Sequence, residues 1–143
     1  MTTTDNPLPI TVSVTVNTSA ATCWKLWTTP ADILQFNNPF PDWHTAKVDI
    51  DLKEGGRLFY RMEAKEGSTG FDFAGIYTRL IPAQLIEYTG TDGRKAINRF
   101  TAAGNTTIVT EIFEPDAATP LDLRSFCQHI LDSFKIYAEQ PIK

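Results

Sequence analysis

The chain has 143 residues, of which 42% are hydrophobic and 21% are charged, and its formal net charge is −4. This length is sufficient for one domain with a sizeable core and too short for two ordinary domains. The apolar content is typical of a folded globular protein, and the acidic balance argues against nucleic-acid binding, which needs a basic stripe. No apolar run approaches the roughly 18 residues of a membrane-spanning helix.

Residues 1–9 lack the basic and apolar regions of a secretory signal peptide, so we expect a short flexible tail and a cytoplasmic protein. Residues 10–143 are expected to form a single domain, with no linker or repeat to divide it. Cys23 and Cys127 have no partner spacing for metal or redox chemistry, and only two histidines accompany them. The sequence therefore implies neither a metal nor another cofactor.

The N-terminal part predicts one strand followed by two helices. Residues 10–16 alternate apolar and polar side chains, as a strand with one covered face does. Residues 17–19 offer N-cap oxygens for a short helix that carries Cys23 and Trp27. A second helix is expected to begin at residues 29–32, with the hydroxyl of Thr29 as its cap and Pro30 at a position whose N–H has no helical partner.

Residues 45–113 predict six consecutive strands, separated by glycine-containing turns. Apolar side chains take every second position, first at Ala46, Val48, Ile50 and Leu52 and then along each later strand. The final segment, roughly residues 120–139, has its apolar side chains at helical spacing and is opened by a Thr-Pro-Leu-Asp start signal at 119–122. The expected order is therefore β-α-α-β-β-β-β-β-β-α, an α+β arrangement.

This order and several local strings resemble the helix-grip fold of the START and polyketide-cyclase superfamily. The strings are Ile10–Trp24, Trp27–Asp32, Asp42-Trp43-His44, Glu54–Arg57, Gly70–Gly75 with Tyr77, Ile81-Pro82, Leu85–Tyr88 and Thr110-Glu111. Within the superfamily they are similar to the bacterial family related to the C-terminal domain of the heat-shock-protein-ninety ATPase activator. The resemblance covers residues 10–139 and implies a seven-stranded curved antiparallel sheet wrapped around a long C-terminal helix, with a cavity between them.

The alternation of side chains assigns a set of residues to the cavity face. The predicted ligand-binding residues are Trp43, Tyr60, Met62, Phe71, Phe73, Tyr77, Tyr88, Asn98, Phe100, Glu111, Phe113, Phe126, Ile130 and Phe134. Glu111 lies between two apolar positions of a strand, so its carboxyl group is turned inward, where it needs a partner or a functional reason. On one interpretation Glu111 and a tyrosine hydroxyl orient the polar end of a ligand. On the other, Glu111 bonds to a tyrosine or Asn98, or a bulge in the strand turns its side chain outward.

The leading hypothesis is a binding protein for a small hydrophobic or aromatic molecule, such as a lipid or a polyketide-like compound. A cavity lined by aromatic side chains with few polar groups is what such ligands require. The alternatives are an enzyme of cyclase, dehydratase or hydrolase type, using Glu111 with His44 or a tyrosine as acid and base, or a cochaperone-like interaction module. The sequence favours binding over catalysis, but it identifies neither the ligand nor a catalytic residue.

A homodimer is also considered, because the opposite face of the predicted sheet is not uniformly polar. The apolar residues assigned to that face are Phe59, Ile76, Ile97, Ile108 and Ile112. Several such residues on neighbouring strands can form one interface patch, whereas isolated ones reflect only the preference of these residues for strands.

Overall fold

The computed structural model describes residues 9–38, 40–114 and 123–140. Within them lie seven strands and three helices in the order expected from the sequence. Their bounds are β1 Ile10–Val16, α1 Ala20–Thr28, α2 Pro30–Phe36, β2 Trp43–Ile50, β3 Arg57–Ala64, β4 Gly70–Ile81, β5 Leu85–Gly90, β6 Lys95–Ala103, β7 Thr106–Phe113 and α3 Leu123–Ala138. The predicted tail up to residue 8 and the predicted helix start at residues 119–122 lie outside the described residues.

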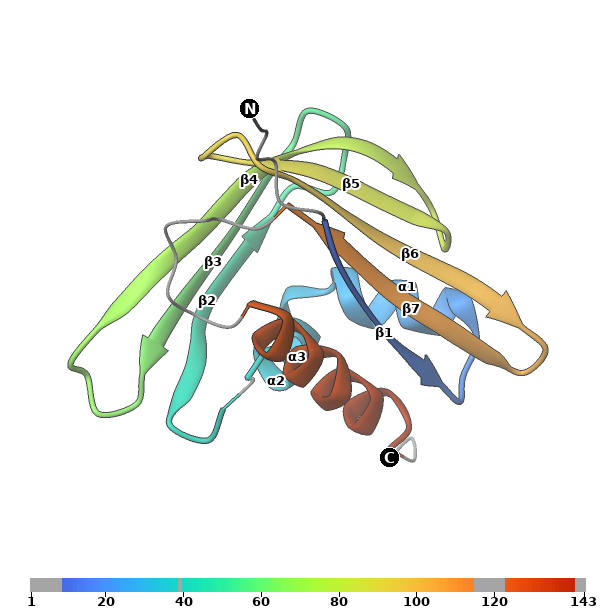
Figure 1. The fold of residues 1–143 in the computed structure, drawn as a ribbon, viewed down its shortest axis with the longest axis horizontal. Coiled ribbons are helices and arrows are strands. Elements are labelled where there is room, and N and C mark those ends of the chain that lie inside the picture. Colours follow the sequence, from blue (N-terminus) through green and yellow to red (C-terminus); the bar gives the residue numbers. More distant parts are fainter. Residues whose placement is uncertain (1–8, 39, 115–122, 141–143) are drawn as a thin grey trace, which may run out of the picture.

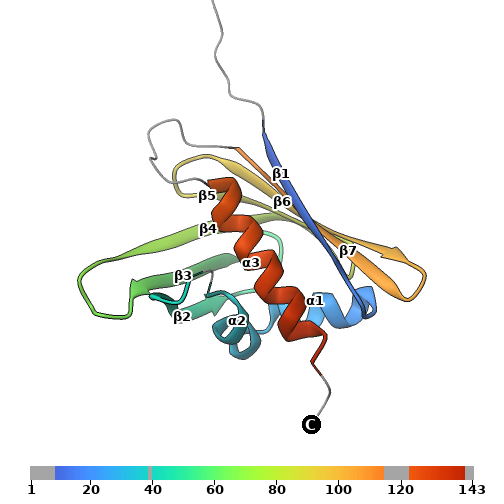
Figure 2. The same cartoon turned by 60° about the horizontal axis from the view of Figure 1, so that its bottom comes forward.

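The strands form one antiparallel sheet in the order β1-β7-β6-β5-β4-β3-β2. Figure 1 shows that the sheet is strongly bent, with β2, β3 and β4 on one arm and β1, β6 and β7 on the other. Helix α3 lies in the opening between the two arms, and Figure 2 shows it crossing the concave side of the sheet. This is the predicted α+β helix-grip architecture.

The alternation predicted for β2 is interrupted by a bulge. The register with β3 shifts between Thr45 and Lys47, so that Thr45 faces inward at 5% exposure and Ala46 is exposed. The extra residue reverses the faces, as a β-bulge does. The expectation that Ala46 shares the covered face is therefore wrong, and Leu52 lies beyond the end of the strand and is exposed.

The two N-terminal helices are separated by a single residue, Thr29. Ser19 caps α1 as predicted, because its side chain accepts a hydrogen bond from the backbone N–H of Thr22 at 3.1 Å. The predicted cap of α2 is wrong, since the Thr29 hydroxyl donates instead to the carbonyl oxygen of Lys25 at 2.6 Å. The Thr29 hydroxyl thus donates to a carbonyl oxygen in the last turn of α1. Helix α2 has no side-chain cap and begins with Pro30, whose backbone nitrogen needs no hydrogen-bond acceptor.

Helix α3 is held at one side of the sheet. It packs against β1, α1 and α2, and three of its side chains donate hydrogen bonds to carbonyl oxygens of the edge strand β1. These donors are Arg124, Gln128 and Lys135, which bond to Thr11, Ser13 and Thr15. Because the helix is anchored on β1, space remains between it and the opposite arm of the sheet.

One hydrogen bond links the C-terminal end of α3 to the start of α2. The hydroxyl of Tyr137 donates to the carboxylate of Asp32 at 2.5 Å, and this bond raises the pKa of Tyr137 to about 12. We expect Tyr137→Phe to lower the free energy of unfolding by about 1–2 kcal/mol, toward the lower end for a bond to a charged group, because this bond is only partly buried. Urea denaturation would measure it, and the same loss in an Asp32→Ala background, which has no acceptor for the hydroxyl, would contradict the assignment.

Among the described residues, no helix has both the length and the apolar character needed to cross a membrane.

Candidate ligand-binding site

A cavity of about 400 Å³ lies between α3 and the arm of the sheet formed by β3, β4 and β5. Its walls come from the inward positions of these strands, from β6 and β7, from the ends of α1 and α2, and from α3. The sheet bends over this space while α3 is anchored on β1, so the helix does not fill it. The volume is within the range of sites for small organic molecules.

Three aromatic rings form the wall contributed by β3, β4 and β5. The rings of Tyr60 and Phe73 meet edge to face with centroids 5.8 Å apart, and those of Phe73 and Tyr88 repeat this arrangement at the same distance. Between Phe73 and Tyr77 the inward position of β4 is Gly75, where a side chain would meet the carbonyl oxygen of Thr89 at 2.7 Å. The close approach of β4 and β5 therefore excludes a side chain beside this wall.

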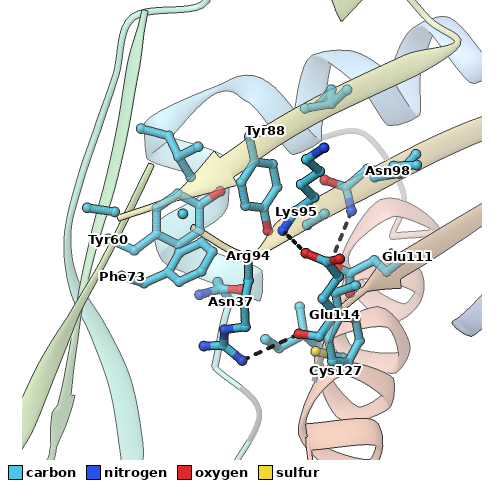
Figure 3. Close-up of a pocket in the computed structure, with 18 of the residues that line it drawn as sticks. Asn37, Tyr60, Phe73, Tyr88, Arg94, Lys95, Asn98, Glu111, Glu114 and Cys127 are labelled. Carbon is cyan, nitrogen blue, oxygen red and sulfur yellow. Dashed lines mark hydrogen bonds between the residues drawn. The ribbon is translucent and has the colours of Figure 1, made fainter. Parts of the chain in front are cut away.

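Opposite the aromatic wall, one carboxyl group faces the cavity (Figure 3). Glu111 on β7 is paired in register with Asn98 on β6, whose side-chain amide donates to one carboxylate oxygen at 3.1 Å. The other oxygen, Oε1, is buried and has no hydrogen-bond partner among the described residues. Burial raises the pKa of Glu111 to about 7, and the bond from Asn98 opposes this rise only in part.

The hydroxyl and thiol groups of the cavity are neutral at physiological pH. Burial raises the pKa of Tyr60, Tyr88 and Cys127, and the charge of Glu111 adds to the effect at all three. Burial also raises the pKa of Tyr77 to about 12. Glu111 is therefore the group in the cavity whose charge changes near neutral pH.

A second polar group lies where α2 ends. The side-chain amide of Asn37 donates to Thr45 Oγ1 at 3.0 Å, and the Thr45 hydroxyl donates in turn to the backbone carbonyl of Asn37. Asn37 also lies 3.3 Å from the sulfur of Met62. Both Asn37 and Thr45 are buried, so this bonding joins α2 to the bulged part of β2 and fixes one end of the cavity.

The mouth of the cavity is lined by charged residues from the turn between β5 and β6 and from the end of β7. Arg94 pairs with Asp92 at 2.5 Å and holds the pKa of that carboxyl below its usual range. The carboxylate of Glu114 accepts a hydrogen bond from the backbone N–H of Lys95 at 2.7 Å. The first pair lies within the turn, and the bond between Lys95 and Glu114 joins the two segments at the mouth.

Most of the residues predicted for the site line the cavity, but three do not. Those that line it are Tyr60, Met62, Phe71, Phe73, Tyr77, Tyr88, Asn98, Glu111, Phe113, Phe126 and Ile130. Phe100 and Phe134 are 4% and 0% exposed and pack in the core against Trp27. Trp43 lies outside the lining, with its ring 5.9 Å from that of Phe71. Helix α1 fills the space that Phe100 and Phe134 would otherwise face.

His44 is not brought near Glu111. It lies on the edge strand β2, and β3, β4, β5 and β6 separate that strand from β7, which carries Glu111. His44 does not line the cavity, so the acid–base pair of His44 and Glu111 considered from the sequence does not form. Of the two partners considered from the sequence, the tyrosines line the cavity together with Glu111.

Several lining residues were not predicted. Trp27, Phe36 and Asn37 reach the cavity from the two short helices, and Asp92, Arg94, Lys95 and Glu114 form its mouth. Helical spacing assigns Trp27 and Phe36 to a buried face but does not say that the face borders a void. The two charged turn residues Asp92 and Arg94 resemble any solvated turn in sequence.

On the convex face, the five apolar residues considered for a homodimer are only partly covered. Ile76 is 45% exposed and Ile108 is 36% exposed, while Phe59, Ile97 and Ile112 are half-buried. Glu87 and Thr89 on β5 lie between Ile97 and Ile76 in the register, so polar side chains interrupt the patch. The homodimer stays a prediction.

The fold and the cavity define a helix-grip protein with an interior cavity, and comparison with known proteins identifies the family. The sequence profile of the family described as Activator of Hsp90 ATPase homolog 1-like protein matches residues 17–138. The chain therefore belongs to this AHSA1-like family, as the resemblance indicated. No curated protein sequence matches it.

Solved structures agree with this assignment. The AHSA1-like protein from Aeromonas hydrophila is 34% identical, with a TM-score of 0.81 over 91% of this chain and 92% of its own. A protein from Cytophaga hutchinsonii is 44% identical, with a TM-score of 0.79 over 92% of each chain. A protein from Chromobacterium violaceum is 19% identical with a TM-score of 0.82, covering 94% of this chain and 99% of its own, and shows the shared fold alone.

Proposed function

We propose that this protein binds a small, mainly apolar molecule in the cavity between α3 and the sheet, and that the polar end of the ligand lies at Glu111. The observation that carries the proposal is the unpartnered carboxylate oxygen Oε1 of Glu111, buried in the wall of a cavity of about 400 Å³. A buried acceptor without a partner is costly and rare in a folded protein. A bound molecule that donates to this oxygen removes the cost.

The remaining walls support an apolar ligand body. The rings of Tyr60, Phe73 and Tyr88 and the side chains of α3 offer broad apolar contact, whereas charged groups lie at the mouth. Such a distribution, with few polar groups and large apolar walls, is typical of small-molecule sites. Among the described residues beside Glu111, Tyr60 and Tyr88 are the candidate catalytic partners, and their pKa values are raised far from neutral, which disfavours acid–base catalysis. Binding is therefore the function we propose, with the cytoplasm as the proposed location.

Native mass spectrometry of the purified full chain tests the proposal first. We expect a fraction of the protein to carry an additional non-covalent mass that is lost on denaturation. In parallel, the neutral fluorophore N-phenyl-1-naphthylamine should bind with a stoichiometry near one and gain fluorescence on leaving water. No added mass together with no saturable fluorophore binding would contradict a functional cavity.

Filling the cavity should abolish binding without unfolding the protein. Cys127 lines the cavity from α3, so Cys127→Trp places a large ring in the void, and we expect affinity for N-phenyl-1-naphthylamine to fall about tenfold or more. Ile136→Trp is the matched control, because Ile136 lies on the same helix at 68% exposure. Fluorescence titration and thermal melting would be measured for both variants. Equal binding by the Cys127 variant, with melting unchanged, would place the fluorophore elsewhere.

A further inference from the structure

The charges and hydrogen-bonding groups that line the cavity indicate which ligands it accepts. Glu111 offers an acceptor oxygen with no partner among the described residues. The other described groups around it are neutral: Tyr60 and Tyr88 from the sheet, Asn98 from β6 and Cys127 from α3. Val12 of β1 is its register partner on the remaining side. Among the described residues, no cation from the elements packed around Glu111 is placed to offset its charge.

The cations among the described lining residues lie at the mouth. They are Arg94, which is committed to Asp92 at 2.5 Å, and Lys95, which is exposed. Neither contributes to the pKa of Glu111, which burial and the bond from Asn98 determine. An anionic ligand would bring a second negative charge next to Glu111 in a poorly solvated space, where like charges repel strongly.

The aromatic wall opposite Glu111 is suited to a positively charged group. Aromatic faces carry partial negative charge and attract cations, and the attraction grows when water is excluded. Tyr60, Phe73 and Tyr88 all line the cavity, and neighbouring rings are inclined to each other by 74° and 84°, so the wall offers aromatic groups in different orientations. Figure 3 shows these rings on one side of the cavity and Glu111 with Asn98 on the other.

Resting on the proposed binding function, we propose that the ligand carries a cationic nitrogen, a protonated amine on an apolar body, held between the carboxylate of Glu111 and the rings of Tyr60, Phe73 and Tyr88. One N–H of the ammonium group occupies the free acceptor Oε1, and the aromatic faces take the rest of its charge. The apolar body extends along the cavity toward α3. Hydrophobic amines are thereby selected over neutral and anionic molecules of the same shape.

Three probes of one shape separate the inference from the binding function itself. They are 1-naphthylmethylammonium, its neutral isostere 1-ethylnaphthalene, and the anion 1-naphthoate, each titrated against bound N-phenyl-1-naphthylamine. At pH 8 we expect the ammonium to bind about tenfold more tightly than the isostere, and the anion to bind most weakly. Binding of the isostere at least as tightly as the ammonium would leave the cavity function standing and overturn the cationic preference. No competition by any probe would overturn both.

The pH dependence of ligand affinity provides an independent test of the proposal. The ammonium stays protonated between pH 5.5 and 8, so its affinity should rise about tenfold across this interval as Glu111 ionises near pH 7. The isostere should show no such rise. A ligand group that accepts a hydrogen bond from protonated Glu111 would instead bind more weakly as the pH rises. An ammonium affinity that falls with rising pH would overturn the proposal.

Two pairs of variants assign the effect to the named groups. Glu111→Gln should reduce the ammonium-to-isostere ratio to about one, while Glu87→Gln, on the opposite face of the sheet, should leave it unchanged. Tyr88→Leu should lower the ratio about threefold or more, whereas Tyr88→Phe, which keeps the ring, should preserve it. Melting curves establish that each variant is folded. A ratio that survives Glu111→Gln in the folded protein would overturn the proposal.

Discussion

Phe134→Ala is expected to lower the free energy of unfolding by about 3–5 kcal/mol, the cost of deleting a large aromatic side chain from a packed interior. Phe134 has 0% exposure, and its ring lies 5.0 Å from that of Trp27 and 4.8 Å from that of Phe36, centroid to centroid. It joins α3 to both short helices. Removing it takes away aromatic contacts that α3 makes with both short helices, and urea denaturation would measure the loss.

Phe73→Ala is the matched comparison, because it removes the same side chain from the cavity wall. One side of the Phe73 ring borders the void, so fewer contacts are lost, and we expect a cost of about 1–2 kcal/mol. The two variants should also differ in binding. Phe73→Ala should weaken retention of N-phenyl-1-naphthylamine, since the ring is part of the wall. Equal destabilisation by both substitutions would mean that Phe73 is packed like a core residue and would contradict the cavity.

Glu111→Gln is expected to stabilise the protein at pH 8 by about 2–3 kcal/mol and to have little effect on stability at pH 4. The folded carboxyl group has a pKa of about 7, whereas 4.5 is its ordinary value in an unfolded chain. Between these values the folded state binds more protons than the unfolded state. Wild-type stability is therefore fully present below about pH 4.5 and falls as pH rises to 7, because ionisation then requires a desolvated charge.

Glutamine keeps the shape of the side chain but does not titrate. The difference in free energy of unfolding between variant and wild type should therefore grow from about pH 4.5 to about pH 7 and level off above it. Thermal and urea unfolding from pH 4 to pH 8 would measure the difference. Glu87→Gln, which removes a carboxylate from the opposite face of β5, should show no comparable growth. A difference that stays constant with pH would mean that Glu111 is well solvated or paired in the folded protein.

Local pattern alone was sufficient for most of the fold. Alternation with a period of two placed the strands and their inward faces, and glycine turns placed the hairpins between them. It turned Glu111 inward together with Tyr60 and Tyr88, and the structure places all three in the cavity wall. The resemblance to the helix-grip family, carried by the element order and several local strings, then implied the architecture, in which an apolar sheet face and an apolar helix face cover each other.

Only the tertiary structure decided which inward residues border a void and which are packed. Phe73, Phe100 and Phe134 carry the same side chain at inward positions, yet only Phe73 lines the cavity. Periodicity says which face a side chain is on, but it contains no information about what lies opposite that face. Here the answer depends on α1 covering Phe100 and Phe134 while α3 is anchored on β1, away from β3, β4 and β5.

The same limit applies to the polar groups of the site. The bulge at Thr45, the contact of Asn37 with that strand, and the separation of His44 from Glu111 depend on strand register across the sheet. Register is set by the pairing of segments that are distant in sequence, and a single inserted residue reverses the faces. The sequence by itself determined that a carboxyl group enters an aromatic interior, and the three-dimensional arrangement decided that it has one amide partner and one free oxygen.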